Sequence, residues 1–136
     1  MKQIAGLLLT ALFASACLAQ PAFEDYPVDE VYDGFLATMR MNSHELAPQY
    51  ADEANRQTDI GPNFAGVHTL FTFDCGANCD ELVVMNTESG WMLAHFKTCG
   101  SHEFHLESRL LVINPDSERC ETSYYLASAW AVEPLE

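Results

Sequence analysis

Hydrophobic and polar positions follow two different patterns along this 136-residue chain. From about residue 63 onward, short apolar runs rich in β-branched and aromatic residues alternate with turn-forming stretches. This alternation is typical of β-strands joined by tight turns. It predicts five strands, over residues 67–74, 79–86, 91–97, 109–114 and 123–132.

The connections between these strands are short, so consecutive strands should pair with their neighbours as an antiparallel meander. The clearest hairpin turn is TESGW at 87–91, where Gly90 suits a left-handed backbone position. The continuous apolar runs LVVM at 82–85 and LLVI at 110–113 predict central strands covered on both faces.

A helical period precedes the strands. Leu46, Tyr50 and Ala54 fall on one face at i, i+4 spacing. Pro48 suits the first position of a helix, because its missing N–H has no partner there anyway. We therefore expect one amphipathic helix near residues 47–58.

Residues 35–41, FLATMRM, predict one more short strand before the helix. Together these elements predict an α+β fold. One N-terminal amphipathic helix should lie on an antiparallel meander of five or six strands, and the domain should be held by two disulfides. The sheet should begin at about residue 63, within a single domain over residues 20–136.

Residues 1–19 have the layout of a signal peptide. Lys2 is followed by an apolar run over residues 4–13 and then by small residues. The run is too short to span a bilayer, and cleavage is expected after Ala19. The alternative is lipidation at Cys17, because residues 14–17 partly resemble a lipobox. Either route predicts an exported protein, periplasmic or extracellular, that contacts a membrane only if Cys17 is lipidated.

The charge is strongly acidic, with 6 Lys+Arg against 20 Asp+Glu and a net charge of −14. Removal of residues 1–19 takes Lys2 with it, which leaves 5 basic against 20 acidic residues, or −15. Such a surface repels nucleic acid and anionic lipid, and it attracts a cationic protein partner. The alternative interpretation is a surface that only keeps the protein soluble.

Four cysteines remain after Cys17, and an even number in an exported chain favours two disulfides. Four cysteines allow three pairings. The local pairing joins Cys75 to Cys79 and Cys99 to Cys120. A rival pairing has a geometric basis, because a three-residue hairpin loop at 88–90 would place Cys79 opposite Cys99.

The segment CGANC at 75–79 has three interpretations. A redox centre needs Cys-x-x-Cys at a helix N-terminus, whereas this spacing is one residue longer and lies between predicted strands. The neighbouring Asp74, Asp80 and Glu81 would also disfavour a thiolate. A zinc site would need reduced cysteines, which export disfavours. A disulfide that closes a tight loop fits best.

Four segments together carry a resemblance: PNFAG at 62–66, CGANC at 75–79, TESGW at 87–91 and ESRLLVINP at 107–115. In this order they resemble a family of small exported bacterial proteins with no established activity. The family tends to His-Tyr where this chain has Val67-His68, and to Asp where it has Glu107. Its members often lack the later cysteines, which implies that Cys75 pairs with Cys79.

Three histidines, His95, His102 and His105, lie within 11 positions and are weak candidates for metal ligands. His102 and His105 would point to opposite faces of a strand, since their separation is odd. No helical pair of histidines is present, so we expect no metal site and no cofactor.

Other catalytic motifs do not occur, and no catalytic residue is assigned. Asn63 of the PNFAG corner is either structural or a binding residue. The loop at 75–79 and the loop near 99–105 should share one end of the meander. That end would gather four acidic side chains into a candidate binding surface: Asp74, Asp80, Glu81 and Glu103.

The sequence thus predicts three classes of function. The first is a non-enzymatic envelope binding module, of inhibitor or immunity type, for a cationic partner. The second is a thiol–disulfide redox protein that uses Cys75 and Cys79. The third is a structural or lipid-anchored surface protein.

Overall fold

The computed structural model describes residues 20–136, so the expected signal peptide and Cys17 lie outside the described residues. One α-helix, α1 (Ala47–Arg56), precedes the strands, and short 3-10 turns lie at Phe23–Asp25 and Thr58–Ile60. The seven strands are β1 (His68–Asp74), β2 (Asp80–Asn86), β3 (Met92–Thr98), β4 (His102–Phe104), β5 (Leu110–Ile113), β6 (Ser123–Ala127) and β7 (Val132–Pro134).

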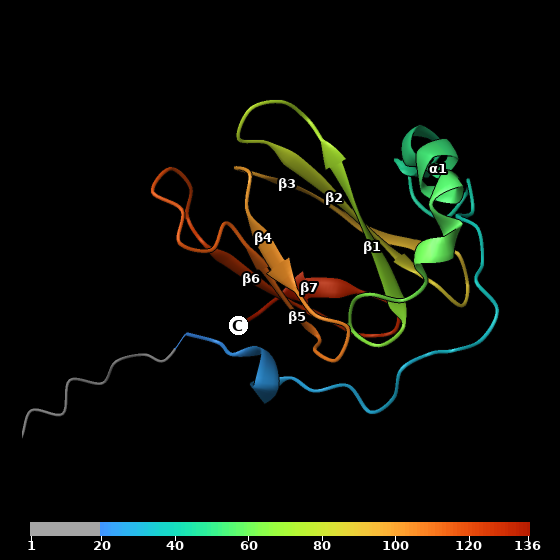
Figure 1. The fold of residues 1–136 in the computed structure, drawn as a ribbon, viewed down its shortest axis with the longest axis horizontal. Coiled ribbons are helices and arrows are strands. Elements are labelled where there is room, and N and C mark those ends of the chain that lie inside the picture. The colour runs from blue at the N-terminus through green and yellow to red at the C-terminus, as the bar shows by residue number, and fades with distance from the viewer. Residues whose placement is uncertain (1–19) are drawn as a thin grey trace, which may run out of the picture.

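The strands form two antiparallel sheets, β1-β2-β3 and β4-β5-β6-β7, each a meander in chain order (Figure 1). The expected single sheet of five or six strands is therefore wrong, although the mixed fold class, the one helix and the two disulfides are confirmed. The two extra strands, β4 and β7, have three residues each, too few to show a period. The single strand expected over residues 123–132 is wrong beyond Ala127, because a turn in which Ser128 N donates to Ala131 O at 2.8 Å separates β6 from β7.

The first sheet lies between α1 and the second sheet. On one face of β2, Val83 and Met85 pack in the same cluster as the buried side of α1. On the other face, Leu82 and Val84 pack with Leu111 of β5. The prediction that the run 82–85 is covered on both faces is thus confirmed, and the run 110–113 is buried throughout.

Helix α1 begins at Ala47, one residue before Pro48, and ends two residues earlier than expected. Tyr50 and Ala54 are buried, and Leu46 packs against the same cluster, so the predicted apolar face is confirmed. Within residues 20–136, no helix has the length and apolar character needed to cross a membrane.

Residues 35–41 do not form the expected strand. They run beside the β2–β3 hairpin turn, where Ala37 N donates to Thr87 O and Arg40 N donates to Gly90 O, each at 2.9 Å. Two backbone hydrogen bonds to the end of a turn do not make a ladder, which explains the wrong prediction.

The N-terminal segment 20–28 lies against the second sheet. Ser108 Oγ donates to Phe23 O at 2.8 Å, and Arg109 N donates to Tyr26 O at 2.9 Å. Val28 N donates to Glu107 O at 3.2 Å. From here the chain crosses to α1 on the far side of the molecule (Figure 1).

Candidate functional site

Both disulfides lie at one end of the molecule, which we call the disulfide end. The structure pairs Cys75 with Cys79 and Cys99 with Cys120, the pairing that the resemblance implies. Their Cα atoms are 5.1 and 6.4 Å apart, both within the usual range for a disulfide. All four cysteines are half-buried.

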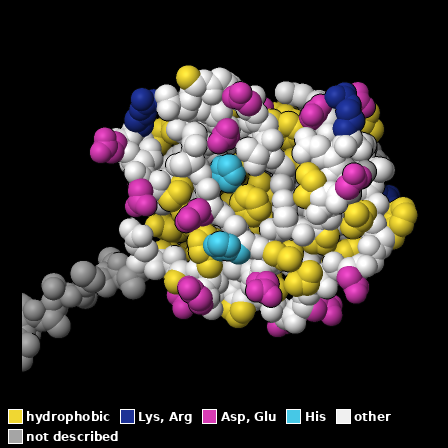
Figure 2. Space-filling model, in the orientation of Figure 1, with side chains coloured by type: hydrophobic (Ala, Val, Ile, Leu, Met, Phe, Trp, Pro, Cys, Tyr) yellow, Lys and Arg dark blue, Asp and Glu magenta, His cyan; other side chains and the backbone are white. Residues whose placement is uncertain are grey.

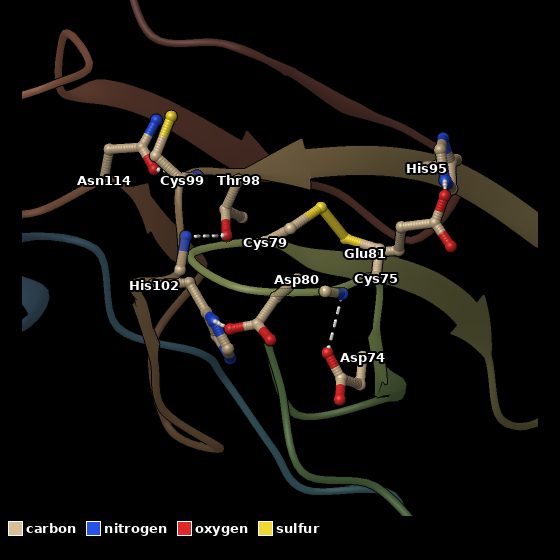
Figure 3. Close-up of a disulfide and its surroundings, with 12 residues drawn as sticks. Asp74, Cys75, Cys79, Asp80, Glu81, His95, Thr98, Cys99, His102 and Asn114 are labelled. Carbon is tan, nitrogen blue, oxygen red and sulfur yellow. Dashed lines mark hydrogen bonds and ion pairs between the residues drawn. A yellow bond between two sulfur atoms is a disulfide. The ribbon is translucent and has the colours of Figure 1, made fainter.

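Asp80 and Glu81, the first two residues of β2, point to opposite faces of the first sheet (Figure 3). Asp80 faces the second sheet, where its Oδ2 lies 3.7 Å from His102 Nδ1. This Nδ1 is buried and has no hydrogen-bond partner, and Thr72 Oγ1 lies 3.4 Å from the other ring nitrogen. Burial lowers the pKa of His102, and the charge of Asp80 acts against that shift.

Glu81 faces the helix side, where it forms a cluster with Tyr50 and His95. His95 Nε2 lies 3.0 Å from the Tyr50 hydroxyl and 3.5 Å from Glu81 Oε1. Burial, together with a hydrogen bond to Glu81 and its negative charge, raises the pKa of Tyr50. The cluster ties α1 to the sheet, because Tyr50 comes from the helix and its two partners from β2 and β3.

The other two acids of the expected binding surface lie apart from these. Asp74 is exposed, and its Oδ1 accepts a hydrogen bond of 2.9 Å from Gly76 N within the CGANC loop. Glu103 of β4 lines a cavity of about 100 Å³ with Val112 and Tyr124. The four acids therefore form no single patch, since two face histidines and one belongs to another surface.

Asn63 uses its side chain within the fold. Its Nδ2 donates to Leu70 O at 3.0 Å, and its Oδ1 accepts from Leu70 N at 2.7 Å. The amide thus replaces a neighbouring strand at the edge of β1, which supports the structural interpretation of the PNFAG corner.

The three histidines considered as metal ligands lie in three different surroundings. His95 contacts Tyr50, His102 contacts Asp80, and the His105 ring packs edge-on against Phe23 at 4.2 Å between centroids. Within residues 20–136, no three His, Cys, Asp or Glu side chains are arranged to hold a metal ion.

A cavity of about 530 Å³ opens where the N-terminal segment meets the loop before β5. We call it the acidic groove. Four exposed acidic residues line it: Glu24, Asp29, Glu30 and Glu107. Phe23 and His105 line it too, and among the described lining residues there is no Lys and no Arg.

A second cavity, of about 340 Å³, adjoins the acidic groove, because residues 27–30 line both. Glu88 of the hairpin turn and Arg109 line it as well. Ala129, also in its lining, precedes Trp130, whose side chain is 70% exposed.

The acidic groove was not predicted from the sequence. The acidic stretch FEDYPVDE at 23–30 was visible, but Glu107 and His105 lie about 80 positions further on. The hydrogen bonds between the N-terminal segment and residues 107–109, together with the packing of Phe23 on His105, bring these residues together.

Figure 2 shows acidic side chains over the whole visible face, whereas basic side chains appear only near its edges. No known protein family, no curated protein and no solved structure matches this chain. The resemblance to small exported bacterial proteins therefore stays a prediction.

Proposed function

We propose that this chain is an exported, non-enzymatic binding module whose acidic groove takes up a basic segment of a partner protein. The observation that carries the proposal is the groove lining, in which four acidic residues border one concave space and no described Lys or Arg does. Arg109 lines the adjoining cavity and forms no ion pair with these acids. Two disulfides are compatible with export.

The groove suits a basic side chain for two reasons. Carboxylates that surround a concave space reinforce each other's field, so a cation in the groove interacts with several of them at once. Phe23 and His105 add flat rings on which the stem of a Lys or the plane of an Arg can lie.

The groove also has a defined shape. Ser108 Oγ donates to Phe23 O, and Val28 N donates to Glu107 O. These two hydrogen bonds join the N-terminal wall of the groove to the wall formed by residues 105–108. A groove that is formed before binding loses less conformational entropy when a partner enters it.

The expected binding surface at the disulfide end is less suited to this role. Asp80 and Glu81 each lie beside a histidine and are only about a quarter exposed, 26% and 23% for their side chains. A partner would have to displace these contacts before it could reach the carboxylates.

The test uses a lysine-rich peptide as the probe and two variants of the full chain with equal charge change. In the groove variant, Glu24, Glu30 and Glu107 become Gln and Asp29 becomes Asn. In the control variant, four exposed acids outside the groove are neutralised in the same way: Glu45, Asp52, Glu118 and Glu121.

We expect the groove variant to bind the peptide about 30-fold more weakly, since four exposed ion pairs contribute about 0.5 kcal/mol each. The control variant should bind nearly as well as the wild type. Equal losses in the two variants would show that only net charge matters, and the groove would have to be abandoned as the site.

The natural partner can then be sought with the immobilised full chain in an envelope extract. A partner that fits the proposal is basic, is released by high salt, and is captured by the control variant but not by the groove variant.

A second candidate function is thiol–disulfide chemistry at Cys75 and Cys79, favoured by the position of this disulfide in a surface loop where neither cysteine is fully buried. An insulin-reduction assay tests it. Activity that is lost in Cys75→Ser would favour this function over the binding module.

A further inference from the structure

Cys79 and Cys99 belong to different disulfides, but Cys79 directly precedes β2 and Cys99 directly follows β3. The register pairs Asp80 with Thr98 and Glu81 with Lys97, and it continues unshifted as far as Val84. One step beyond Asp80 and Thr98, the same register places Cys79 opposite Cys99.

The two chains stay together past this point. A Cβ added at Gly100 would lie 3.0 Å from Asn78 Cα and 3.7 Å from Cys79 N, so the backbones are in contact there. Because side chains alternate along a strand, the same register places Cys79 and Cys99 on the side of Glu81 and Lys97. Figure 3 shows both cysteines at this end of the sheet, with the Cys79 sulfur bonded to Cys75. Asp80 and His102 point the other way.

Facing residues of an antiparallel pair have Cα atoms about 4.5–5.5 Å apart, and a disulfide spans about 4.4–6.8 Å between Cα atoms. A Cys79–Cys99 disulfide therefore fits the strand register as it stands. The structure contains the local pairing, yet it also provides the geometry of the rival pairing.

We propose that the two disulfides form an exchange pair, in which Cys79 attacks Cys99 once the Cys75–Cys79 bond has been reduced. The device is a redox-sensitive switch, and it does not depend on the acidic groove. A dithiol reductant first donates two electrons and two protons to the Cys75–Cys79 bond, which gives two thiols and the oxidised reductant.

In the second step the Cys79 thiolate attacks Cys99 Sγ. The Cys79–Cys99 bond forms, the Cys99–Cys120 bond breaks, and its electron pair leaves on Cys120, which takes up a proton. The product has one disulfide, Cys79–Cys99, and two thiols, Cys75 and Cys120. No further oxidant or reductant is needed.

Chain entropy does not oppose the exchange. The Cys99–Cys120 bond closes a loop with a sequence separation of 21, and Cys79–Cys99 would close one of 20. The entropy that a disulfide removes from the unfolded chain depends on loop length, so the two bonds are nearly equal in this respect.

The exchange would change what the disulfide connects. Cys99–Cys120 joins the end of the first sheet to the segment between β5 and β6 of the second. Cys79–Cys99 would lie within the first sheet alone. The segment at 114–122 would then lose its covalent link to β3, so reduction at the CGANC loop would act on the second sheet.

Two single variants test whether Cys79, and not Cys75, lies opposite Cys99. In Cys75→Ser the remaining Cys79 faces Cys99, so we expect peptide mapping without reduction to find the Cys79–Cys99 bond and a Cys120 thiol. In the matched variant Cys79→Ser the remaining Cys75 has no facing cysteine, and the Cys99–Cys120 bond should stay. Retention of Cys99–Cys120 in both variants, or its equal loss in both, would overturn the proposal.

The wild-type chain gives a second readout that does not depend on how the variants fold. The folded protein is treated briefly with dithiothreitol, and its thiols are then trapped by alkylation. Labels on Cys75 and Cys120 in chains that carry the Cys79–Cys99 peptide support the exchange. Labels confined to Cys75 and Cys79 contradict it.

Discussion

His68 is a titratable residue held entirely inside the protein. His68 Nε2 lies 2.7 Å from Ser128 O, and Nδ1 is buried without a hydrogen-bond partner. Burial lowers the pKa of His68, and the hydrogen bond to the Ser128 carbonyl acts against that shift. The folded state thus favours the neutral ring, with its proton on Nε2.

A pH dependence of stability follows from this position. The lowered pKa means that the unfolded chain takes up a proton before the folded chain does. The stability due to the neutral ring is complete above the unfolded pKa of about 6.5 and is lost as the pH falls below it. His102, whose pKa is also lowered, contributes with the same sign.

We therefore expect the free energy of unfolding to fall between about pH 6.5 and 5, by at most about 1.4 kcal/mol per pH unit for each histidine. Denaturant unfolding at several pH values measures it. His68→Gln keeps a donor for Ser128 O but cannot titrate. The free energy of unfolding of this variant should therefore fall less over the same pH range. A pH dependence in His68→Gln as steep as that of the wild type would contradict the role of His68.

Asp80 and Glu81 show which features of single residues could be predicted from the sequence. Consecutive residues of a strand point to opposite faces, so the separation of Asp80 from Glu81 was predictable once β2 was recognised. Their histidine partners were not, because His102 reaches Asp80 from the other sheet. A strand period carries no information about which sheet lies opposite.

At the level of elements, the turn of the β2–β3 hairpin depends on Gly90. Its φ is +75°, a left-handed value, and a Cβ added there would overlap the Thr38 carbonyl oxygen. Gly90 thus lets residues 35–41 lie directly against the hairpin, where Arg40 N donates a hydrogen bond to Gly90 O.

Gly90→Ala should therefore be strongly destabilising, and Gly76 provides the matched control. Gly76 also has positive φ, but a Cβ added there meets nothing within 4 Å. We expect Gly76→Ala to lose only about 1–2 kcal/mol through backbone strain, and Gly90→Ala to lose clearly more. Thermal unfolding of the two variants compares them, and similar losses would mean that the Thr38 contact contributes little.

Most elements could be predicted from the sequence because each has its own period or length. Helix α1 has an i, i+4 apolar face, and β1, β2, β3 and β5 are within one residue of the expected bounds at each end. The division into two sheets could not be predicted. It depends on residues 99–101, which carry the chain from β3 to the second sheet, and nothing in the turn CGSH distinguishes this from another hairpin.

For the whole molecule, the two disulfides should contribute unequally to stability. Their sequence separations are 4 and 21. On the chain-entropy model, the short loop stabilises the fold by about 2 kcal/mol and the long one by about 3.4 kcal/mol. The long one also joins the two sheets, whereas the short one closes a single turn.

Paired replacements test this difference without leaving a lone thiol. We expect Cys99→Ala with Cys120→Ala to lower the free energy of unfolding more than Cys75→Ala with Cys79→Ala. Denaturant unfolding under identical conditions measures both. A larger loss for the short loop would mean that native contacts around CGANC, not chain entropy, dominate there.

The contact of the N-terminal segment with the second sheet has a consequence for the order of folding. Ser108 Oγ reaches Phe23 O across a sequence separation of 85. Contacts between such distant residues form slowly, because a long loop must close before they contribute. Residues 20–28, which are made before the second sheet, are thus among the last to find their place. If the chain is exported as proposed, it can cross the membrane with this segment still unpaired, and the acidic groove can form only after residues 105–109 have arrived.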